Sequence, residues 1–325
     1  MKAVVLEKYG SPEALQLKEV SKPKPKWNQV LVKVHAVSIN DWDWGILTAT
    51  PFANRWMAGI FIPSKIPILG CDIAGRIEAV GANVKRFKVG DDVFGDLSSN
   101  GWGGFAEYLC ADENALTLKP EDMPFDDAAC LPQAGLLALQ GLLQGKIDSG
   151  KHKKVLINGA SGGAGTLAIQ IAKSYGAEVT AVCSAEKMDL VKSLGADRLI
   201  DYKQQDFTRD TDLYDLILDV KGFHSLFDYR RVLNSKGHYV MLGGSNTLAL
   251  QTILIGPLVS MFSDRKLGLL ILKPNKNLEM LTQLYEDGKV RPVIDKRYPL
   301  EQASEAMRYY AHGLARGKVV ISMES

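Results

Sequence analysis

The stretch "GASGGAGTLAIQIAK", residues 159–173, joins a glycine-rich turn to a run with alanine and isoleucine at helical spacing. It follows the short apolar run "KKVLI", which is typical of a buried strand. In a strand, turn and helix of this kind, glycines let the backbone approach a pyrophosphate, and the free N–H groups of the helix face the anion. The stretch therefore predicts a dinucleotide-binding turn made of Ala160, Ser161, Gly162, Gly163, Ala164 and Gly165.

Strands and helices continue to alternate after this turn. Six strands are predicted from about residue 125 onward, at "HKKVLING", "AEVTAVCS", "DRLIDY", "YDLILDV", "GHYVMLGG" and "KLGLLIL". Alternation of this kind predicts an α/β fold with a parallel, doubly wound sheet, as in two mononucleotide-binding halves. This context favours a ligand-binding turn over the alternative, a glycine turn without a ligand.

The region before this sheet has a different pattern. Residues 1 to about 120 contain short alternating runs such as "QVLVKVHAV" and "GRIEAV" between turn clusters, so we expect an all-β region. The segment after "ILKP" is too short to form a domain and is expected to return to that β-rich part. The predicted organisation is therefore a β-rich domain over 1–121, an inserted dinucleotide-binding domain over 122–274, and a return to the first domain over 275–325.

The residue after the second strand of the predicted sheet indicates which dinucleotide is bound. An Asp or Glu there would hold the ribose hydroxyls of NAD and repel a 2′-phosphate, whereas this chain has Ser184, with Lys187 three residues later. We therefore predict NADPH, bound through Ser184 and Lys187. The alternative is that Lys187 is an ordinary exposed lysine at a helix start, and Glu186 lies nearby.

Composition excludes several function classes. Lys plus Arg number 39 and Asp plus Glu 37, and no basic stripe is interleaved with aromatic residues, so nucleic acid is not an expected partner. The four cysteines have no CxxC spacing and no signal peptide is evident, which favours the cytoplasm. The apolar segment 248–262 is too short and too interrupted to cross a membrane. We expect a helix packed inside the protein there, with a membrane-surface contact as the alternative.

Four motifs together resemble the medium-chain dehydrogenase/reductase superfamily, in its zinc-free quinone oxidoreductase branch. They are "PILGCDIAGRIEAVGANVKRFKVGDDVFG" (67–95), "GASGGAG" (159–165), "LGADRLIDY" (194–202) and "GKVVIS" (317–322). The tail "LKPNKNLEMLTQLYEDGKVRPVID" is similar to a subgroup with chloroplast-envelope quinone oxidoreductase homologues and reticulon-interacting reductases. The resemblance implies a GroES-like catalytic domain with a Rossmann insertion, a substrate cleft between the two, and a possible homodimer.

The resemblance also locates the zinc ligands of the related alcohol dehydrogenases. Their positions are taken here by Asn40, Cys71 and a residue near Ala134, which leaves one thiol where zinc requires three or four ligands. The structural-zinc lobe is replaced by "DLSSNGWGG" (96–104), and no two of the five histidines pair at ligand spacing. We therefore predict no metal. The histidines are His35, His152, His224, His238 and His312.

Without a metal, the expected chemistry is hydride transfer from NADPH to a quinone or an α,β-unsaturated carbonyl, whose product anion is delocalised. Asn40 is the predicted hydrogen-bond donor in catalysis, and its alternative is a turn asparagine bonded to its own backbone. Asp43 is expected to hold the local turn. Flat rings suit flat conjugated substrates, so five aromatic residues are candidates for the cleft. They are Trp44, Phe52, Trp56, Phe61 and Trp102.

The resemblance implies five further cofactor contacts. They are Tyr202, Val220, Gly243, Gly244 and Lys318. A competing hypothesis is an NADPH-binding protein with little catalysis, acting as a sensor, a structural protein or a membrane-surface partner. A zinc alcohol dehydrogenase is disfavoured by the ligand positions above. The sequence does not distinguish quinone from enone as substrate.

Overall fold

The computed structural model describes residues 1–148 and 153–323, and the chain in it forms two compact units. Unit 1 consists of Met1–Gln133, Pro274–Glu279 and Ile294–Ser325, and unit 2 of Ala134–Lys273 and Met280–Val293. The α/β class, with a β-rich unit and an inserted Rossmann-type unit, is confirmed. The first boundary lies at 133/134 instead of the expected 121/122, and residues 280–293 belong to unit 2.

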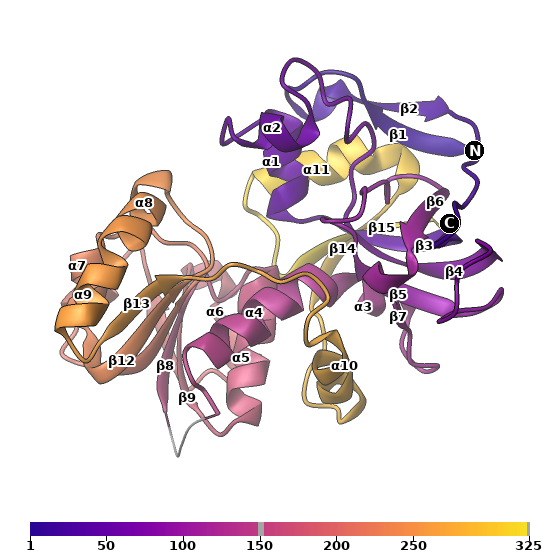
Figure 1. Ribbon diagram of the computed structural model, residues 1–325. Coiled ribbons are helices and arrows are strands. Elements are labelled where there is room, and N and C mark those ends of the chain that lie inside the picture. Colours follow the sequence, from indigo (N-terminus) through magenta and orange to yellow (C-terminus); the bar gives the residue numbers. More distant parts are fainter. Residues whose placement is uncertain (149–152, 324–325) are drawn as a thin grey trace. The chain divides into compact units, whose positions relative to one another are not determined.

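Unit 2 is built on a six-stranded parallel sheet (Figure 1). Numbered along the chain from β8, the spatial order β10-β9-β8-β11-β12-β13 is 3-2-1-4-5-6, which is the order of dinucleotide-binding sheets. Its central strands are buried on both faces, as a parallel sheet with helices on both sides requires. The strands are β8 (Lys154–Asn158), β9 (Glu178–Cys183), β10 (Arg198–Asp201), β11 (Tyr214–Asp219), β12 (Leu233–Met241) and β13 (Lys266–Leu269).

Helices cover both faces of this sheet (Figure 1). They are α4 (Pro132–Gln144), α5 (Gly163–Ser174), α6 (Met188–Ser193), α7 (Leu226–Arg231), α8 (Asn246–Leu254) and α9 (Gly256–Phe262), with short 3-10 turns η3 (Ala185–Lys187) and η4 (Phe207–Arg209). A further helix, α10 (Leu278–Glu286), follows β13 in the chain. Helix α5 packs on β8 and β9, and α9 packs on β13. One buried cluster, which includes Ile217, Tyr229 and Tyr239, forms the core between β11, β12 and α7.

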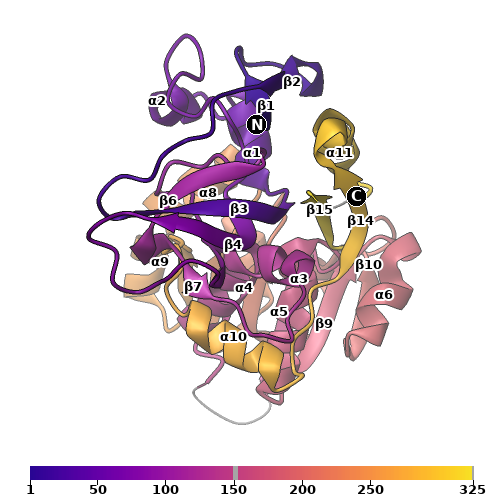
Figure 2. The same cartoon turned by 90° about the vertical axis from the view of Figure 1, so that its right-hand side faces the viewer.

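Unit 1 contains a seven-stranded sheet and a two-stranded β1-β2 ribbon. The sheet order is β14-β15-β3-β4-β5-β7, with β6 paired to β3, so the last strand of the described chain lies beside a strand from its beginning. Figure 2 shows α11 beside β14 and β15, against which it packs. The elements are β1 (Lys2–Leu6), η1 (Pro12–Ala14), β2 (Leu15–Glu19), β3 (Gln29–Ser38), α1 (Asp41–Thr48), α2 (Asn54–Ala58), β4 (Asp72–Val80), β5 (Asp92–Asp96), β6 (Tyr108–Asp112), η2 (Glu113–Ala115), β7 (Thr117–Leu118), α3 (Phe125–Cys130), β14 (Ile294–Pro299), η5 (Leu300–Gln302), α11 (Ala303–Ala311) and β15 (Lys318–Ser322).

The expectation of an all-β region over residues 1–120 is wrong for residues 41–58. Two helices, α1 and α2, follow β3. Asn40 precedes α1 with extended backbone angles, and its N–H donates to Asp43 Oδ2 at 2.9 Å, so a polar pair stabilises the first turn of the helix. The expectation that Asp43 holds this turn is confirmed, but "NDWD" was not recognised as a helix start.

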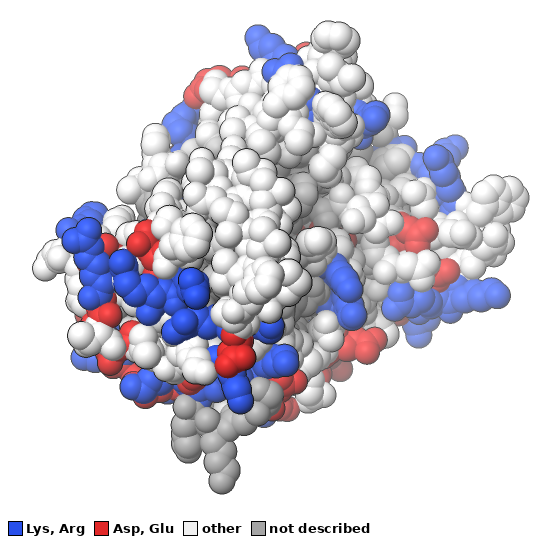
Figure 3. Space-filling view, turned by 60° about the vertical axis from the view of Figure 1, so that its left-hand side comes forward, with Lys and Arg blue, Asp and Glu red and all other residues white. Residues whose placement is uncertain are grey.

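The expectation that residues 248–262 form a helix packed inside the protein is also wrong. The segment forms two helices, because Pro257 has no N–H to continue α8 and instead lies in the first turn of α9. Several of its apolar side chains are exposed, and Figure 3, which brings this side of unit 2 forward, shows a broad area without charged groups. They are Leu250, Ile253, Leu254, Leu258, Met261 and Phe262. Among the described residues no helix is long and apolar enough to cross a membrane.

Candidate functional site

The glycine turn of unit 2 has the shape expected of a dinucleotide cradle. Gly159 has a φ of 79°, a left-handed conformation that favours glycine, and it ends β8 in a sharp turn. The N–H groups of Gly159 and Ala160 both donate to Val182 O, at 3.2 and 3.1 Å, which ties the turn to β9. Gly159 was not among the predicted residues, although its place directly after the strand could have indicated it.

Two further glycines permit close approach. A Cβ on Gly165 would lie 2.3 Å from Gly159 O, so only glycine allows α5 to pack this closely on the turn. A Cβ on Gly162 would have no neighbour nearer than 3.6 Å, so that side of the turn is open. Hydrogen bonding within α5 begins with Thr166 N to Gly162 O at 2.9 Å, which leaves the N–H groups of the three preceding residues outside the helical ladder. The turn therefore fits a pyrophosphate.

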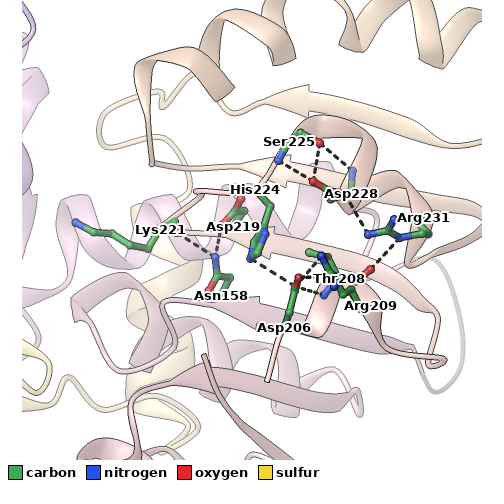
Figure 4. Close-up of polar contacts among 10 residues, drawn as sticks. All are labelled: Asn158, Asp206, Thr208, Arg209, Asp219, Lys221, His224, Ser225, Asp228 and Arg231. Carbon is green, nitrogen blue, oxygen red and sulfur yellow. Dashed lines mark hydrogen bonds and ion pairs between the residues drawn. The ribbon is translucent and has the colours of Figure 1, made fainter. Parts of the chain in front are cut away.

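A buried carboxylate supports the neighbouring loop of unit 2 (Figure 4). Asn158, at the end of β8, donates through Nδ2 to Asp219 Oδ1 at 2.8 Å and to Lys221 O at 3.0 Å. Tyr239 OH donates to the other oxygen of Asp219 at 2.8 Å. Burial raises the pKa of the Asp219 carboxyl, although its hydrogen bonds act in the opposite direction. Neither Asn158 nor Asp219 was singled out from the sequence, although each is a polar residue at the carboxyl end of a predicted strand.

This support brings three of the predicted cofactor residues together. Val220 N donates to Asn158 O at 3.0 Å, and Gly243 N donates to Asp219 O at 3.2 Å. Gly244 has a φ of 139°, and a Cβ there would lie 2.5 Å from Gly222 O. The chain ends of β8, β11 and β12 therefore meet beside the glycine turn, at the edge where doubly wound sheets bind nucleotides.

A cavity of about 470 Å³ is lined by Asp206, Thr208, Arg209, His224, Asp228 and Arg231, which are labelled in Figure 4. Its charged groups are already paired with one another, since Asp206 contacts Arg209 at 3.3 Å and Asp228 contacts Arg231 at 3.1 Å. His224, one of the histidines without a partner at ligand spacing in the sequence, also lines it. None of the predicted site residues lines this cavity, and we assign it no function.

The predicted 2′-phosphate site contains an additional ion pair. Ser184 is buried at the end of β9, and Lys187 N donates to Ser184 O at 3.0 Å. The Ser184 hydroxyl and the Lys203 ammonium, 3.2 Å from Glu186 Oε1, lower the pKa of the Glu186 carboxyl to about 2. Tyr202 is 58% exposed beside them. The structure therefore adds Lys203, a cation that the sequence analysis missed, and pairs it with Glu186, which the sequence had already shown nearby.

Asn40 lies in a buried polar cluster of unit 1. It is 5% exposed, and its Nδ2 donates to Asp72 Oδ2 at 3.0 Å, with longer contacts to Ser38 O at 3.3 Å and Cys71 Sγ at 3.9 Å. Its Oδ1 accepts a hydrogen bond from Lys318 Nζ. The side chain is thus bonded across three strands, β3, β4 and β15, and is more than a turn residue bonded to its own backbone.

Asp43 contributes a second carboxyl to this cluster. Its two oxygens accept hydrogen bonds from Asn40 N at 2.9 Å and from Gly70 N at 2.8 Å. Complete burial nevertheless raises the pKa of Asp43 to about 7, with these bonds and the Lys318 charge acting against the shift. At neutral pH this group is therefore poised between its two charge states.

Cys71, Asp72 and Asp96 form the single group of possible metal ligands found among the described residues, with ligand atoms within 4.8 Å of one another. The sequence analysis counted only Cys71. Cys71 Sγ already lies 3.8 Å from Gln133 Nε2 as well as near Asn40, and the Lys318 ammonium acts on all three groups. A zinc ion would displace these amide donors and lie close to a positive charge, so the group does not fit zinc. His152 lies outside the described residues.

Asp72 and Asp96 fit a proton better than a metal. Asp72 Oδ1 and Asp96 Oδ2 are buried without a hydrogen-bond partner among the described residues. Burial and the repulsion between the two carboxyls raise the pKa of Asp72 well above its usual range, and burial raises that of Asp96. A proton on either carboxyl removes the repulsion between the two negative charges. It also supplies a hydrogen-bond donor to a pair of groups that lacks one.

The five predicted cleft aromatics have different surroundings. Phe52, Trp56 and Phe61 are exposed on and beside α2, and Trp44 packs partly against the core of unit 1. Trp102 is a correction. It is 3% exposed within the core, and its Nε1 donates to Ser98 O at 3.1 Å, so its ring does not face a substrate surface in this structure. Trp102 also has a left-handed φ of 63°, a backbone conformation that sequence patterns do not reveal.

Comparison with known proteins agrees with both units. Residues 26–121 match an alcohol dehydrogenase GroES-like domain, and residues 194–321 match the family described as zinc-binding dehydrogenase. The chain is 34% identical to the chloroplast envelope quinone oxidoreductase homolog of Arabidopsis thaliana, over 99% of this chain and 98% of that protein. It is also 34% identical to the chloroplastic NADPH-dependent alkenal/one oxidoreductase of the same plant, over 99% of this chain and 79% of that protein.

Among solved structures, the quinone oxidoreductase of Coxiella burnetii superposes with a TM-score of 0.87 at 30% identity, covering 100% of this chain and 99% of that one. The glycine cradle, the strand order and these relatives lead to one conclusion. The chain belongs to the medium-chain dehydrogenase/reductase superfamily.

Proposed function

We propose that this protein is an NADPH-dependent, metal-free reductase that transfers a hydride to quinones or α,β-unsaturated carbonyls. The observation that carries the proposal is the carboxamide of Asn40, held in a buried cluster where a metal ligand would be expected and where no imidazole lies among the described residues. Relatives named quinone oxidoreductase and alkenal/one oxidoreductase support the same class of acceptor.

Such an acceptor needs little help beyond orientation. When bound, the reduced nicotinamide supplies a hydride, and the acceptor becomes an enolate or hydroquinone anion whose charge is delocalised. One well-placed hydrogen-bond donor can stabilise the charged oxygen. Asn40 Nδ2 has two protons, of which Asp72 takes one at 3.0 Å, while the other has only the longer contacts to Ser38 O and Cys71 Sγ. We assign this second proton to the substrate oxygen.

The cofactor would be held by the glycine turn and by the residues at the end of β9. Residues 160–165 would bind the pyrophosphate, and Val220, Gly243 and Gly244 would line the adjoining chain ends. Ser184, Lys187 and the added Lys203 favour a 2′-phosphate, and so NADPH, whereas Glu186 opposes it. On binding, Lys203 would exchange its contact with Glu186 for the more highly charged phosphate.

Independence from metal is part of the same proposal, because Lys318 supplies positive charge to the cluster of Cys71, Asp72 and Asp96. A cytoplasmic location is proposed too, supported by four cysteines that are all free in the part of the chain that the structure describes.

The test is turnover by purified, chelator-treated protein whose metal content has been measured. We expect NADPH oxidation with both a short enone and a quinone, at a rate unchanged by the chelator and with a higher kcat/KM for NADPH than for NADH. NADH run in parallel is the control for cofactor choice. Activity that falls with the loss of a stoichiometric metal would contradict the metal-free proposal, and a preference for NADH would contradict the assignment of Ser184 and Lys187.

A second candidate function is an NADPH-binding protein with little catalysis. It is favoured by one observation, the exposed apolar side chains of α8 and α9. Such side chains suit a contact with a partner surface, and hydride transfer does not require them. Bound NADPH without turnover of either acceptor would favour this candidate over the reductase.

A further inference from the structure

We propose that Lys318 is the positioning residue of this site, which acts through Asn40 by holding and polarising its carboxamide. This inference rests on the proposed reductase function and deepens it. The resemblance had suggested a cofactor contact for Lys318, and its surroundings point to a different role.

Lys318 begins β15, the strand between β14 and β3, and only 3% of it is exposed. Its ammonium donates to Asn40 Oδ1 and, at 3.2 Å, to Ile39 O. Both acceptors lie in the segment that joins β3 to α1. Because the ammonium is buried and bonded inside unit 1, it is directed to Asn40 instead of to a surface where a phosphate would bind.

The hydrogen bonds fix which way the Asn40 amide faces. An ammonium can only donate, so the atom beside Lys318 must be the amide oxygen, and a carboxylate oxygen without its proton can only accept, so the atom beside Asp72 must be the nitrogen. Lys318 and Asp72 therefore define one orientation from opposite sides. The bond to Oδ1 also draws electrons from the amide, which makes the Nδ2 protons better donors.

Lys318 is also the cation that this cluster depends on. Asp43, Asp72, Asp96 and the Cys71 thiol all lie close enough to be influenced by its charge. The ammonium therefore offsets buried negative charge around Asn40 and helps to keep its carboxamide in the cluster.

The decisive experiment compares Lys318→Met with Lys119→Met. Lys119 is a matched control in the same unit, because its ammonium is also buried and bonded, in this case to the carbonyl oxygens of Pro120 and Met123, both at 2.8 Å. We expect Lys318→Met to lower kcat with the enone about 100-fold, the effect of losing one preorganised electrostatic contact. The Kd for NADPH should stay within about twofold of wild type. Lys119→Met should affect thermal stability with kcat nearly unchanged.

A double-mutant cycle shows whether Lys318 acts through Asn40. If it does, Lys318→Met should cost little further kcat in an Asn40→Ala background, because the group it positions is already absent. In a Lys318→Ala protein, added ethylammonium should restore part of kcat, while tetramethylammonium at equal concentration, which cannot donate, should not.

The outcomes separate the inference from the proposed function. Wild-type protein without turnover would refute the reductase and the inference with it. With wild-type turnover, a normal kcat in Lys318→Met, additive losses in the double mutant, or a large rise in the NADPH Kd would each overturn the inference and leave the reductase intact. The last result would restore Lys318 to the cofactor site.

Discussion

Two glycines of the turn, Gly162 and Gly165, have different neighbours although they are three residues apart. We expect Gly165→Ala to lower stability by about 1–3 kcal/mol, because its Cβ would overlap Gly159 O at 2.3 Å, and to abolish NADPH binding. In Gly162→Ala the new methyl group has room, and alanine readily adopts the φ of −84° found there. The free energy of unfolding of this variant should therefore stay within about 1 kcal/mol of wild type. A methyl group there would face the pyrophosphate and raise the Kd about tenfold, or about 1.4 kcal/mol.

Urea unfolding and NADPH titration of the two variants check this pair. Equal stability losses in both variants would show that the turn is only a packing device. Unchanged NADPH affinity in folded Gly162→Ala would contradict the placement of the pyrophosphate.

At the scale of single residues, the sequence was most informative where the backbone imposes the residue type. Gly165 was predicted because a close helix and strand leave no space for a side chain, and Gly162 because the backbone there must approach a pyrophosphate. Asp72, Asp96 and Lys203 were missed, because their importance comes from side chains that meet only after folding. Trp102 was misplaced for a similar reason, since its burial in the core of unit 1 and its bond to Ser98 O arise only after folding.

At the scale of elements, a set of buried carboxyls lies at the ends of β3, β4 and β5. Their burial should make the free energy of unfolding depend on pH. The pKa of Asp43 is raised to about 7, and those of Asp72 and Asp96 are raised as well. Between about pH 4 and pH 7 the folded state therefore binds more protons than the unfolded state, so the free energy of unfolding falls as pH rises through this range.

Replacing Asp43 should make that fall less steep. We expect Asp43→Asn to reduce the slope by up to about 1.4 kcal/mol per pH unit, the contribution of one proton, in urea unfolding between pH 5 and pH 7. Asp189→Asn, on the exposed surface of α6, is the control and should keep the wild-type slope. Identical slopes in wild type and Asp43→Asn would mean that Asp43 is ionised throughout.

Periodicity predicted the elements of unit 2 well, because parallel strands buried on both faces are continuous apolar runs. It failed for α8 and α9, where an apolar composition was interpreted as burial although many of these side chains face outward. The same pair of helices bears on the possible homodimer. Ser260 Oγ on α9 accepts a hydrogen bond from Leu267 N of edge strand β13 at 2.9 Å, so this edge is partly covered within the chain.

At the scale of the whole molecule, the chain passes between its two units at 133/134, 273/274, 279/280 and 293/294. All five tryptophans lie in unit 1, whereas the predicted pyrophosphate turn lies in unit 2. Because four chain crossings join the units, we expect them to unfold together. NADP⁺ at about 100 times its Kd should then raise the free energy of unfolding, as followed by tryptophan fluorescence, by about 2.7 kcal/mol.

Urea unfolding followed in parallel by tryptophan fluorescence and by circular dichroism tests this coupling. Coincident midpoints, both shifted by NADP⁺, are the expected result. A shift in circular dichroism without a shift in fluorescence would show that the units unfold independently.

The fold class and the insertion could be predicted from the sequence because each unit has its own hydrophobic period. The first boundary was misplaced because α3 packs on β3 and β4 of unit 1, a choice of partner that helical periodicity does not reveal. Residues 280–293 were assigned to the first domain for the same reason. A helix pattern shows which face is apolar, but the surface that covers this face is selected in three dimensions.

The hydrogen bond between Lys318 and Asn40 joins residues 278 positions apart. A ribosome makes Asn40, Asp43, Asp72 and Asp96 long before Lys318, so a growing chain must keep these polar groups hydrated until nearly all of it has been translated. Only the arrival of β15 provides both the strand that lies between β14 and β3 and the cation that the buried carboxyls face. The order of synthesis thus leaves this polar cluster incomplete until late in translation, and a chain that stops short of β15 lacks both the strand that joins β14 to β3 and the cation bonded to Asn40.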